Sequence, residues 1–156
     1  MWPVDQMVTV RPAEPEDSAV WLQMRQALWP EGSEAEHREE MDRFFHSDCP
    51  REPSVVLLAE NADGRLQGFA EISIRPFAEG CRSNRVAYLE GWFVLPEARR
   101  HRVGRALVAA AETWGCSQGC YELASDTDPE NDVGAAAHRA LGFADAGLVR
   151  CFRKDL

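Results

Sequence analysis

The chain has 156 residues, a formal net charge of -9 at pH 7 and 45% hydrophobic residues, values typical of one soluble globular domain over residues 1–156. The acidic balance argues against nucleic acid as a partner, because polyanions bind basic surfaces, and it favours a cationic partner. No apolar run approaches the length of a membrane span and the N-terminus lacks a signal-peptide core, so we expect a cytoplasmic protein with no membrane partner.

The N-terminal half predicts a strand, two helices and a hairpin. Proline and acidic residues open the first helix, which breaks at Trp29-Pro30. Prolines 50 and 53 end the second helix, and Asp63-Gly64 is a turn of the kind that joins hairpin strands. The predicted elements are a strand over 8–12, a helix opened by Glu14-Pro15, a helix capped by Gly32-Ser33, and strands over 54–59 and 66–75.

The central stretch predicts a strand, a basic turn and a helix. Aromatic and β-branched residues run from 86 to 95 and stop at Pro96, which indicates a strand, and Gly91 in its middle suggests a bulge. From Val103 onward, apolar residues recur at helical spacing and end near Gly115. The strand therefore delivers its carboxyl end into the turn that begins the helix.

The C-terminal part predicts three further elements. A strand over 121–125 is followed by a loop over 126–132 and a short helix over 133–141. After a break at Gly142-Phe143, residues 148–153 predict a last strand.

The basic turn inverts the sign of an otherwise acidic chain. It holds four arginines and a histidine within seven residues, and it lies where a helix begins. Unpaired N–H groups and the positive end of the helix dipole favour anions there, so the turn predicts a phosphate pocket. The alternative is a solvated helix start, because charge runs usually face water.

Two motifs resemble the GCN5-related N-acetyltransferase (GNAT) superfamily. Arg99-x-x-Arg102-Val103-Gly104 resembles its pyrophosphate loop, although Arg102 stands where the family has its first glycine, and Ala140-Leu141-Gly142-Phe143 resembles the end of its last helix. The predicted order of elements is also the order of that family. The resemblance implies an α+β class and a GNAT fold, with a mixed central β-sheet splayed at the fourth and fifth strands and helices on both faces.

Four segments together resemble the aminoglycoside 6'-N-acetyltransferases within that superfamily. They are Trp21-Leu22-x-x-Arg25-x-x-Leu28-Trp29, Ser73-Ile74-Arg75, Leu89-Glu90-Gly91-x-x-Val94-Leu95-Pro96 and Ala124-Ser125-Asp126. The resemblance implies transfer of acetyl from acetyl-CoA to the 6'-amine of a cationic aminoglycoside by direct attack, and it implies a homodimer. Two alternatives remain open: an acetyltransferase for another amine, such as a polyamine or a protein N-terminus, and a non-catalytic module that binds CoA or polycations.

The family resemblance also implies which residues hold the cofactor. A bulge at Gly91 would free a backbone N–H to polarise the acyl carbonyl. The cofactor residues implied by the resemblance follow that bulge and continue into the basic turn: Phe93, Val94, Arg99, Arg100, Arg102, Val103, Gly104 and Arg105.

Three side chains are candidates for proton transfer. Because the amine arrives protonated, a carboxylate must accept its proton, and Glu90 or Asp126 could do so. The position of Glu90 on the bulged strand slightly favours it as the base. Either residue could instead only hold the substrate, Glu90 could simply face solvent, and Asp126 could cap a loop. His138 stands where many superfamily members place a tyrosine, so it is the candidate proton donor to the thiolate, or else a side chain bonded to the cofactor or exposed.

The acceptor site is expected to combine carboxylates and aromatic rings. Asp126 and Glu130 belong to an acidic run that could hold ammonium groups. A calcium loop is disfavoured, because the central glycine and the twelfth-position glutamate are missing, and no metal site is predicted. Trp29, Phe77 and Trp92 are predicted to wall the sugar site, whereas Trp21 has the spacing of a core residue.

Overall fold

The computed structural model describes residues 7–46 and 53–156. Its regular elements are β1 (Thr9–Pro12), the 3-10 turn η1 (Pro15–Asp17), α1 (Ser18–Leu28), α2 (Glu34–His46), β2 (Ser54–Glu60), β3 (Leu66–Arg75), β4 (Val86–Val94), η2 (Pro96–Ala98), α3 (Val103–Ser117), β5 (Leu123–Ser125) and α4 (Asp132–Ala140). The five strands form one sheet in the order β1-β2-β3-β4-β5. All neighbours are antiparallel except β4 and β5, which are parallel.

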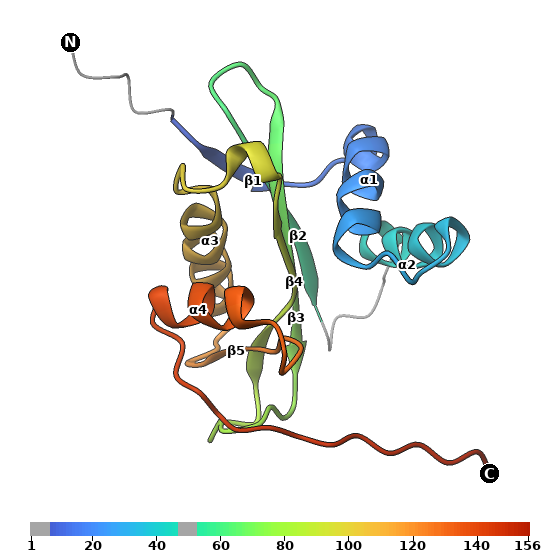
Figure 1. The fold of residues 1–156 in the computed structure, drawn as a ribbon, viewed down its shortest axis with the longest axis vertical. Coiled ribbons are helices and arrows are strands. Elements are labelled where there is room, and N and C mark those ends of the chain that lie inside the picture. Colours follow the sequence, from blue (N-terminus) through green and yellow to red (C-terminus); the bar gives the residue numbers. More distant parts are fainter. Residues whose placement is uncertain (1–6, 47–52) are drawn as a thin grey trace.

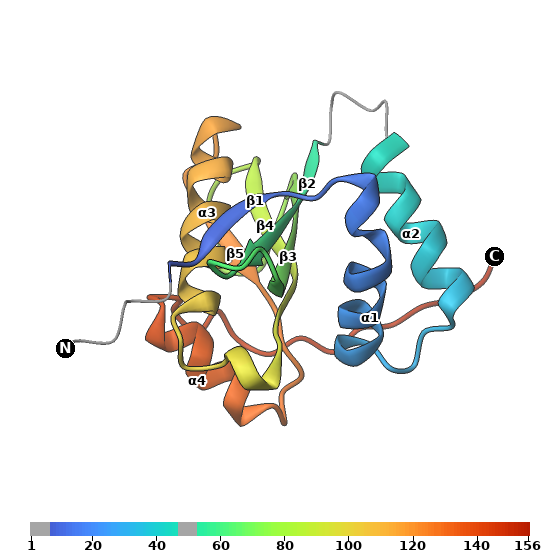
Figure 2. The same ribbon diagram turned by 90° about the horizontal axis from the view of Figure 1, so that it is seen from above.

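The sheet is covered by helices on both faces. Helices α1 and α2 lie on one side and α3 and α4 on the other, as the two views in Figures 1 and 2 agree. The predicted α+β class, with a mixed central sheet and helices on both faces, is confirmed (Figure 1). Within residues 7–46 and 53–156, no helix has both the length and the apolar character needed to cross a membrane.

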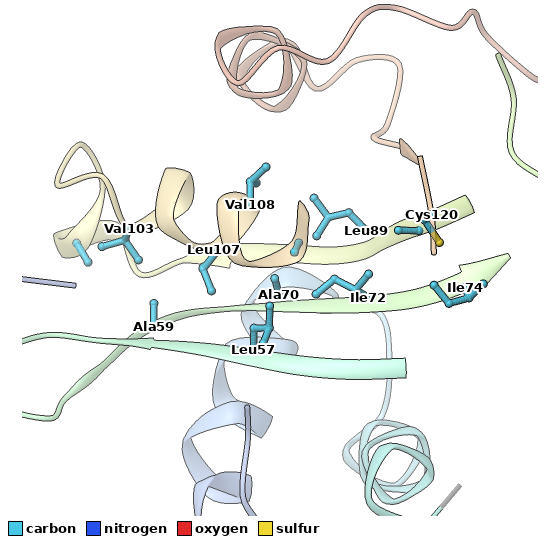
Figure 3. Close-up of a cluster of buried hydrophobic side chains, with 13 residues drawn as sticks. Leu57, Ala59, Ala70, Ile72, Ile74, Leu89, Val103, Leu107, Val108 and Cys120 are labelled. Atoms are coloured by element: carbon cyan, nitrogen blue, oxygen red, sulfur yellow. The ribbon is translucent and has the colours of Figure 1, made fainter. Parts of the chain in front are cut away.

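Two apolar clusters fix the helices to the sheet. Between α3 and the sheet, small and branched side chains such as Ala70, Ile72 and Leu107 are fully buried (Figure 3). On the opposite face, Trp21 and Phe69 are also fully buried. Burial of one such large apolar side chain contributes about 1.5–3 kcal/mol. Trp21 is therefore a core residue, as its helical spacing predicts.

A bulge in β4 changes which face its side chains occupy. Glu71 of β3 pairs with Gly91 and Ile72 pairs with Leu89, so Glu90 is an extra residue without a partner on β3. In a regular strand Leu89 and Gly91 would share a face. Here Leu89 packs in the α3 cluster, whereas Gly91 lies under the Trp29 ring on the α1 side. The predicted bulge is confirmed.

The parallel pair β4 and β5 separates directly beyond this bulge. The two strands pair only over residues 87–89 of β4, and the last pair is Leu89 with Ser125. The residues that follow this last pair are Glu90 in β4 and Asp126 after β5. The predicted splay between the fourth and fifth strands thus places the two candidate carboxylates at its opening.

Most predicted elements are confirmed within one or two residues. The second helix begins with a capping box, in which Ser33 N–H donates to the Glu36 carboxylate over 2.8 Å. The predicted strand over 148–153 is wrong: these residues have no regular structure and Phe152 is 87% exposed. The segment pairs with no strand of the described chain. Pro50, predicted to end the second helix, lies outside the described residues.

Arginines occupy backbone conformations that favour glycine at the start of α3. Arg100 has a φ of 66° and Arg102, the N-cap residue of α3, has a φ of 63°. The left-handed region costs a residue with a Cβ about 1–2 kcal/mol. This conformation explains physically why the resembled family has a glycine where Arg102 stands.

Candidate active site

A cavity of about 570 Å³ opens between the α1–α2 layer and the sheet. It holds five glutamates, one arginine and one histidine. Its lining consists of Arg25, Trp29, Glu31, Gly32, Glu36, His37, Glu40, Glu71 and Glu90. Such an acidic, partly apolar cavity suits a polar cation with an aliphatic or sugar skeleton.

Trp29 forms a fixed wall of this cavity. A Cβ atom added to Gly91 would lie 2.4 Å from Cη2 of the Trp29 ring, so the indole rests directly on the bulged backbone. The ring also meets Phe69 edge-on, with centroids 6.2 Å apart. Its backbone carbonyl accepts a hydrogen bond from Nε2 of His37 over 3.1 Å. These contacts fix the aromatic wall next to Glu90.

Glu90 is held by two neighbours on β3. Arg75 donates from Nε to Oε1 over 2.8 Å and from Nη2 to Oε2, and the Ser73 hydroxyl donates to Oε1 as well. Both carboxylate oxygens are therefore engaged by protein donors. The bidentate arrangement fixes the carboxylate plane at the edge of the cavity.

Tyr88 connects this pair to Asp126. The Tyr88 hydroxyl donates to Oδ2 of Asp126 over 2.8 Å, and the Arg75 guanidinium lies 3.5 Å from the centroid of the Tyr88 ring. Burial, and then the Asp126 carboxylate, raise the pKa of Tyr88 to about 12, so it remains a donor at neutral pH. Asp126 is exposed, and no donor in the described part of the chain bonds its Oδ1.

His138 lies half-buried between the aromatic rings of Trp92 and Phe143, at centroid distances of 5.3 and 5.2 Å. Its Nδ1 is 2.7 Å from the Gly134 carbonyl, which can only accept, so Nδ1 carries a proton. Its Nε2 is 2.9 Å from the Ser125 hydroxyl. When the ring is neutral, its Nε2 accepts a hydrogen bond from that hydroxyl.

A protonated His138 is accommodated equally well. The ring then donates to Oγ of Ser125, which lies 3.2 Å from the Leu89 carbonyl and can donate to it. Both protonation states of the ring therefore keep its hydrogen bonds to Gly134 and Ser125. Such an arrangement suits a residue that gains and loses a proton.

The basic turn lies at the other end of the splay, on the α3 side. Its four arginines are exposed, and none forms an ion pair with a carboxylate within residues 7–46 and 53–156. Together with the free N–H groups of the first turn of α3, they form an anion site. The turn therefore fits the diphosphate of a nucleotide cofactor.

The open edge of β4 leads from this turn toward the carboxylates. The Leu95 N–H donates to the Gln67 carbonyl across to β3. Because backbone groups alternate along a strand, the N–H groups of Trp92 and Val94 point to the open side and that of Phe93 toward β3. Of the two strand residues predicted to contact the cofactor, Phe93 and Val94, only Val94 therefore turns its backbone N–H toward the splay.

Trp92 adds a further donor beside the turn. Its Nε1 is the only buried side-chain nitrogen or oxygen without a partner in the described part of the chain. The indole packs on Gly104, where an added Cβ would lie 2.9 Å from Trp92 Cζ2 and 3.4 Å from Nε1. The splay thus combines phosphate-binding cations, open backbone amides and an unused donor, which fits an acyl-CoA.

Sequence comparison agrees with this geometry. The sequence model of the Acetyltransferase (GNAT) family matches residues 21–143. The chain belongs to the GNAT acetyltransferase family.

Individual relatives are similar over nearly their whole length. The chain is 52% identical to an aminoglycoside N(6')-acetyltransferase type 1 of Klebsiella aerogenes, covering 98% of this chain and 100% of the relative. It is 41% identical to an enzyme described in the same words from Stenotrophomonas maltophilia, covering 95% and 94%. Among solved structures, AAC(6')-Iy in complex with the bisubstrate analog CoA-S-monomethyl-acetylneamine superposes with a TM-score of 0.88 at 36% identity, covering 96% of this chain and 99% of that one.

Some predicted residues lie away from the cavity of this acetyltransferase. Trp92 is on the α3 side of the sheet, because the bulge reverses its face, and Phe77 and Glu130 are exposed in loops that do not line the cavity. Their substrate roles stay predictions. Within the described residues, no group of three or more His, Cys, Asp or Glu side chains is arranged to hold a metal ion.

The fold brings into the site further residues that the sequence did not mark as functional, among them Tyr88, Arg25 and Glu71. Tyr88 links the two candidate carboxylates, while Arg25 and Glu71 form a buried ion pair in the cavity wall. The sequence does contain one indication of the pair formed by Arg25 and Glu71. Arg25 falls on the apolar face of its helix, and Glu71 interrupts an apolar strand, and a charge in either place needs a partner.

Two glycines provide a matched test of the two halves of the site. The Cβ of Gly91→Ala would displace the Trp29 ring, and a displacement near 1 Å in a site can cost about a hundredfold in activity. We therefore expect kcat/KM for the amine to fall by roughly ten- to a hundredfold, with little change in the KM for acetyl-CoA. Gly104→Ala should instead raise the KM for acetyl-CoA, because its Cβ meets Trp92 beside the cofactor turn. Initial-rate kinetics with both substrates varied would distinguish them, and the same pattern in both variants would contradict this division.

Proposed function

We propose that this protein is an acetyl-CoA-dependent aminoglycoside 6'-N-acetyltransferase, an enzyme that confers antibiotic resistance. The single observation that carries the conclusion is the acidic cavity that meets the splayed strands at Glu90, in a chain 52% identical over 98% of its length to an aminoglycoside N(6')-acetyltransferase. A cavity with five carboxylates binds a polycation, and the splay binds the acetyl donor.

The reaction follows from where the two substrates meet. Acetyl-CoA binds with its diphosphate on the basic turn and its acyl group along the open edge of β4. The outward N–H groups of Trp92 and Val94 are positioned to donate to the cofactor and to the oxygen that becomes negatively charged during attack. The aminoglycoside enters from the α1–α2 side, and its amine attacks the acyl carbon directly.

Asp126 is the residue best placed to take the proton from the ammonium group. It is exposed at the mouth of the splay and keeps Oδ1 free, whereas both oxygens of Glu90 are engaged by Arg75 and Ser73. Glu90 then attracts and orients the cation. This assignment differs from the preference for Glu90 that its strand position suggests, because the sequence does not reveal the pairing with Arg75.

His138 supplies the proton to the departing thiolate of CoA. It lies beside the splay, and its hydrogen bonds with Ser125 and Gly134 are satisfied in either protonation state. The ammonium loses two protons in the overall reaction, one of which ends on the thiol and one in solvent.

A homodimer is the expected assembly, and the C-terminal segment 148–156 is its proposed contact. Leu148 and Phe152 are 84% and 87% exposed in an extended chain, and the neighbouring strand β5 is an edge of the sheet. In Figures 1 and 2 this segment leaves α4 and runs toward the α1–α2 side without joining the sheet. Exposed apolar side chains and an open strand edge are features that a second copy would cover.

The expected location is the cytoplasm, where acetyl-CoA is available. The described cysteines, at positions 81, 116, 120 and 151, are free thiols, as is usual in a reducing compartment.

Thiol release from acetyl-CoA tests the function directly. The protein should release CoA rapidly with kanamycin and slowly or not at all with a polyamine or a peptide, measured in parallel at equal concentrations. Mass spectrometry should find one acetyl group on the 6'-amine. Preference for the polyamine or the peptide would reassign the acceptor, and binding of CoA without turnover would identify a non-catalytic module.

Asp126→Asn and Glu90→Gln separate proton transfer from binding. Loss of a general base typically costs about a hundred- to ten-thousandfold in rate, so Asp126→Asn should lower kcat and flatten the acidic limb of its pH profile. Glu90→Gln should mainly raise the aminoglycoside KM, because it removes a charge common to ground and transition states. The reverse pattern, with Glu90→Gln losing kcat and its acidic limb, would make Glu90 the base.

Light scattering coupled to size exclusion tests the assembly. We expect the full chain to be a dimer and the variant with Leu148→Asp and Phe152→Asp to be a monomer, because a buried unpaired carboxylate opposes the contact. Val20→Asp, which changes an exposed apolar residue of α1, is the control and should remain dimeric. A dimeric double variant would move the interface elsewhere.

A further inference from the structure

The cavity contains a buried carboxylate to which the reaction above gives no role. Glu71 lies in the middle of β3, is 3% exposed and lines the cavity. It pairs with Gly91 across the sheet, so it flanks the bulge on the side opposite the splay. A charged group in such a place needs a physical reason, because burying it without partners is costly.

Only one of the two oxygens of Glu71 is bonded within the protein. Oε1 accepts from Nε1 of Trp21 over 3.0 Å and from Nη1 of Arg25. No donor in residues 7–46 and 53–156 bonds Oε2, and this atom is not among the fully occluded side-chain atoms that lack a partner. The free oxygen therefore retains contact with the cavity. Burial raises the pKa of Glu71 to about 6, so the carboxyl is largely ionised at neutral pH.

Arg25 fixes the orientation of this carboxylate. Its side chain is 2% exposed and donates to Glu71 on β3 and to Glu40 on α2. Its guanidinium also lies 4.8 Å from the centroid of the Trp29 ring and donates from Nε to Nδ1 of His37 over 3.4 Å. One cation thus joins α1, α2 and β3, and it occupies Oε1 of Glu71.

The charges of the cavity leave room for an external cation. Arg25 is the only arginine or lysine in the lining, and it already bonds two of the five glutamates. His37 accepts from Arg25 through Nδ1 and donates from Nε2, so it is neutral. The cavity is therefore strongly negative when empty.

We propose that Glu71 is a further substrate-binding residue, whose Oε2 accepts a hydrogen bond from an ammonium group of the aminoglycoside, and that Arg25 is the positioning residue that holds Oε1. This inference rests on the proposed function. Glu90 on β4 and Glu71 on β3 then both bind ammonium groups of the same substrate. Neighbouring strands are about 4.8 Å apart, a spacing that one amino sugar with several ammonium groups can span.

Glu71→Gln keeps the shape of the side chain and removes its charge. Loss of a buried carboxylate that pairs with an ammonium group should raise the aminoglycoside KM and calorimetric Kd by roughly ten- to a hundredfold. The KM for acetyl-CoA should not change, because Glu71 is on the face of the sheet opposite α3. Glu39→Gln is the matched control: it makes the same charge change on the exposed face of α2, where Glu39 pairs with Arg43, and should leave both KM values unchanged.

The pH profile supplies a readout that a purely structural role would not give. As pH falls through about 6, the pKa of Glu71, its carboxylate gains a proton and no longer attracts the ammonium group. Wild-type kcat/KM for the aminoglycoside should therefore fall. Glu71→Gln should lack this component. The other titratable and charged groups that face the cavity, and stay the same in both proteins, are Arg25, Glu31, Glu36, His37, Glu40 and Glu90.

A second variant covers the case in which Glu71→Gln does not fold. Replacing both members of a buried ion pair by apolar residues is often neutral for stability, so Arg25→Met with Glu71→Met should fold and still show the raised aminoglycoside KM. An unchanged aminoglycoside KM in a folded variant, or equal losses for both substrates, would overturn the inference while the proposed function stands. A wild-type protein that acetylates no aminoglycoside would overturn both.

Discussion

The extra residue in β4 is the constraint on which the rest of the site depends. Because no residue of β3 lies opposite Glu90 in the backbone register, the side chains after Glu90 point to the face opposite the one they would occupy in a regular strand. Gly91 then lies under Trp29 on the α1 side, while Trp92 packs on Gly104 on the α3 side. One local irregularity thus builds a wall of the acceptor cavity and a wall of the cofactor site from consecutive residues, and it opens the strand edge between them.

Electrostatics divides the two sites across the same sheet. Exposed arginines at the start of α3 form a positive surface, while glutamates between α1, α2 and the sheet line a negative cavity. In the proposed function, the first attracts the anionic cofactor and the second attracts the polycation. Glu90 and Asp126 lie at the splay between these two surfaces.

The two carboxylates next to the bulge are bonded differently by their arginine partners. Arg75 engages both oxygens of Glu90 near solvent, which leaves that carboxylate in a fixed plane. Arg25 bonds only one edge of the deeply buried Glu71, so the other edge remains for a ligand. A buried pair with an unsatisfied edge is weak as a stabilising device, since desolvation offsets its attraction. The free edge agrees with the substrate-binding role proposed for Glu71.

The sequence by itself determined the order of elements as far as α4, the bulge at Gly91, the basic turn before α3 and the family, because periodicity, turn chemistry and motif spacing act over short stretches of chain. It also placed both candidate carboxylates, since Glu90 is next to the predicted bulge within its strand and Asp126 directly follows a predicted strand. Three features were decided only by the tertiary structure. The pairing of Arg75 with Glu90, the contact of Tyr88 with Asp126 and the burial of Arg25 against Glu71 join residues 15 to 46 positions apart. The segment 148–153 shows the opposite limit: its apolar residues predict a strand, but a strand forms only where its backbone hydrogen bonds are completed by a partner, and this segment pairs with no strand of the described chain.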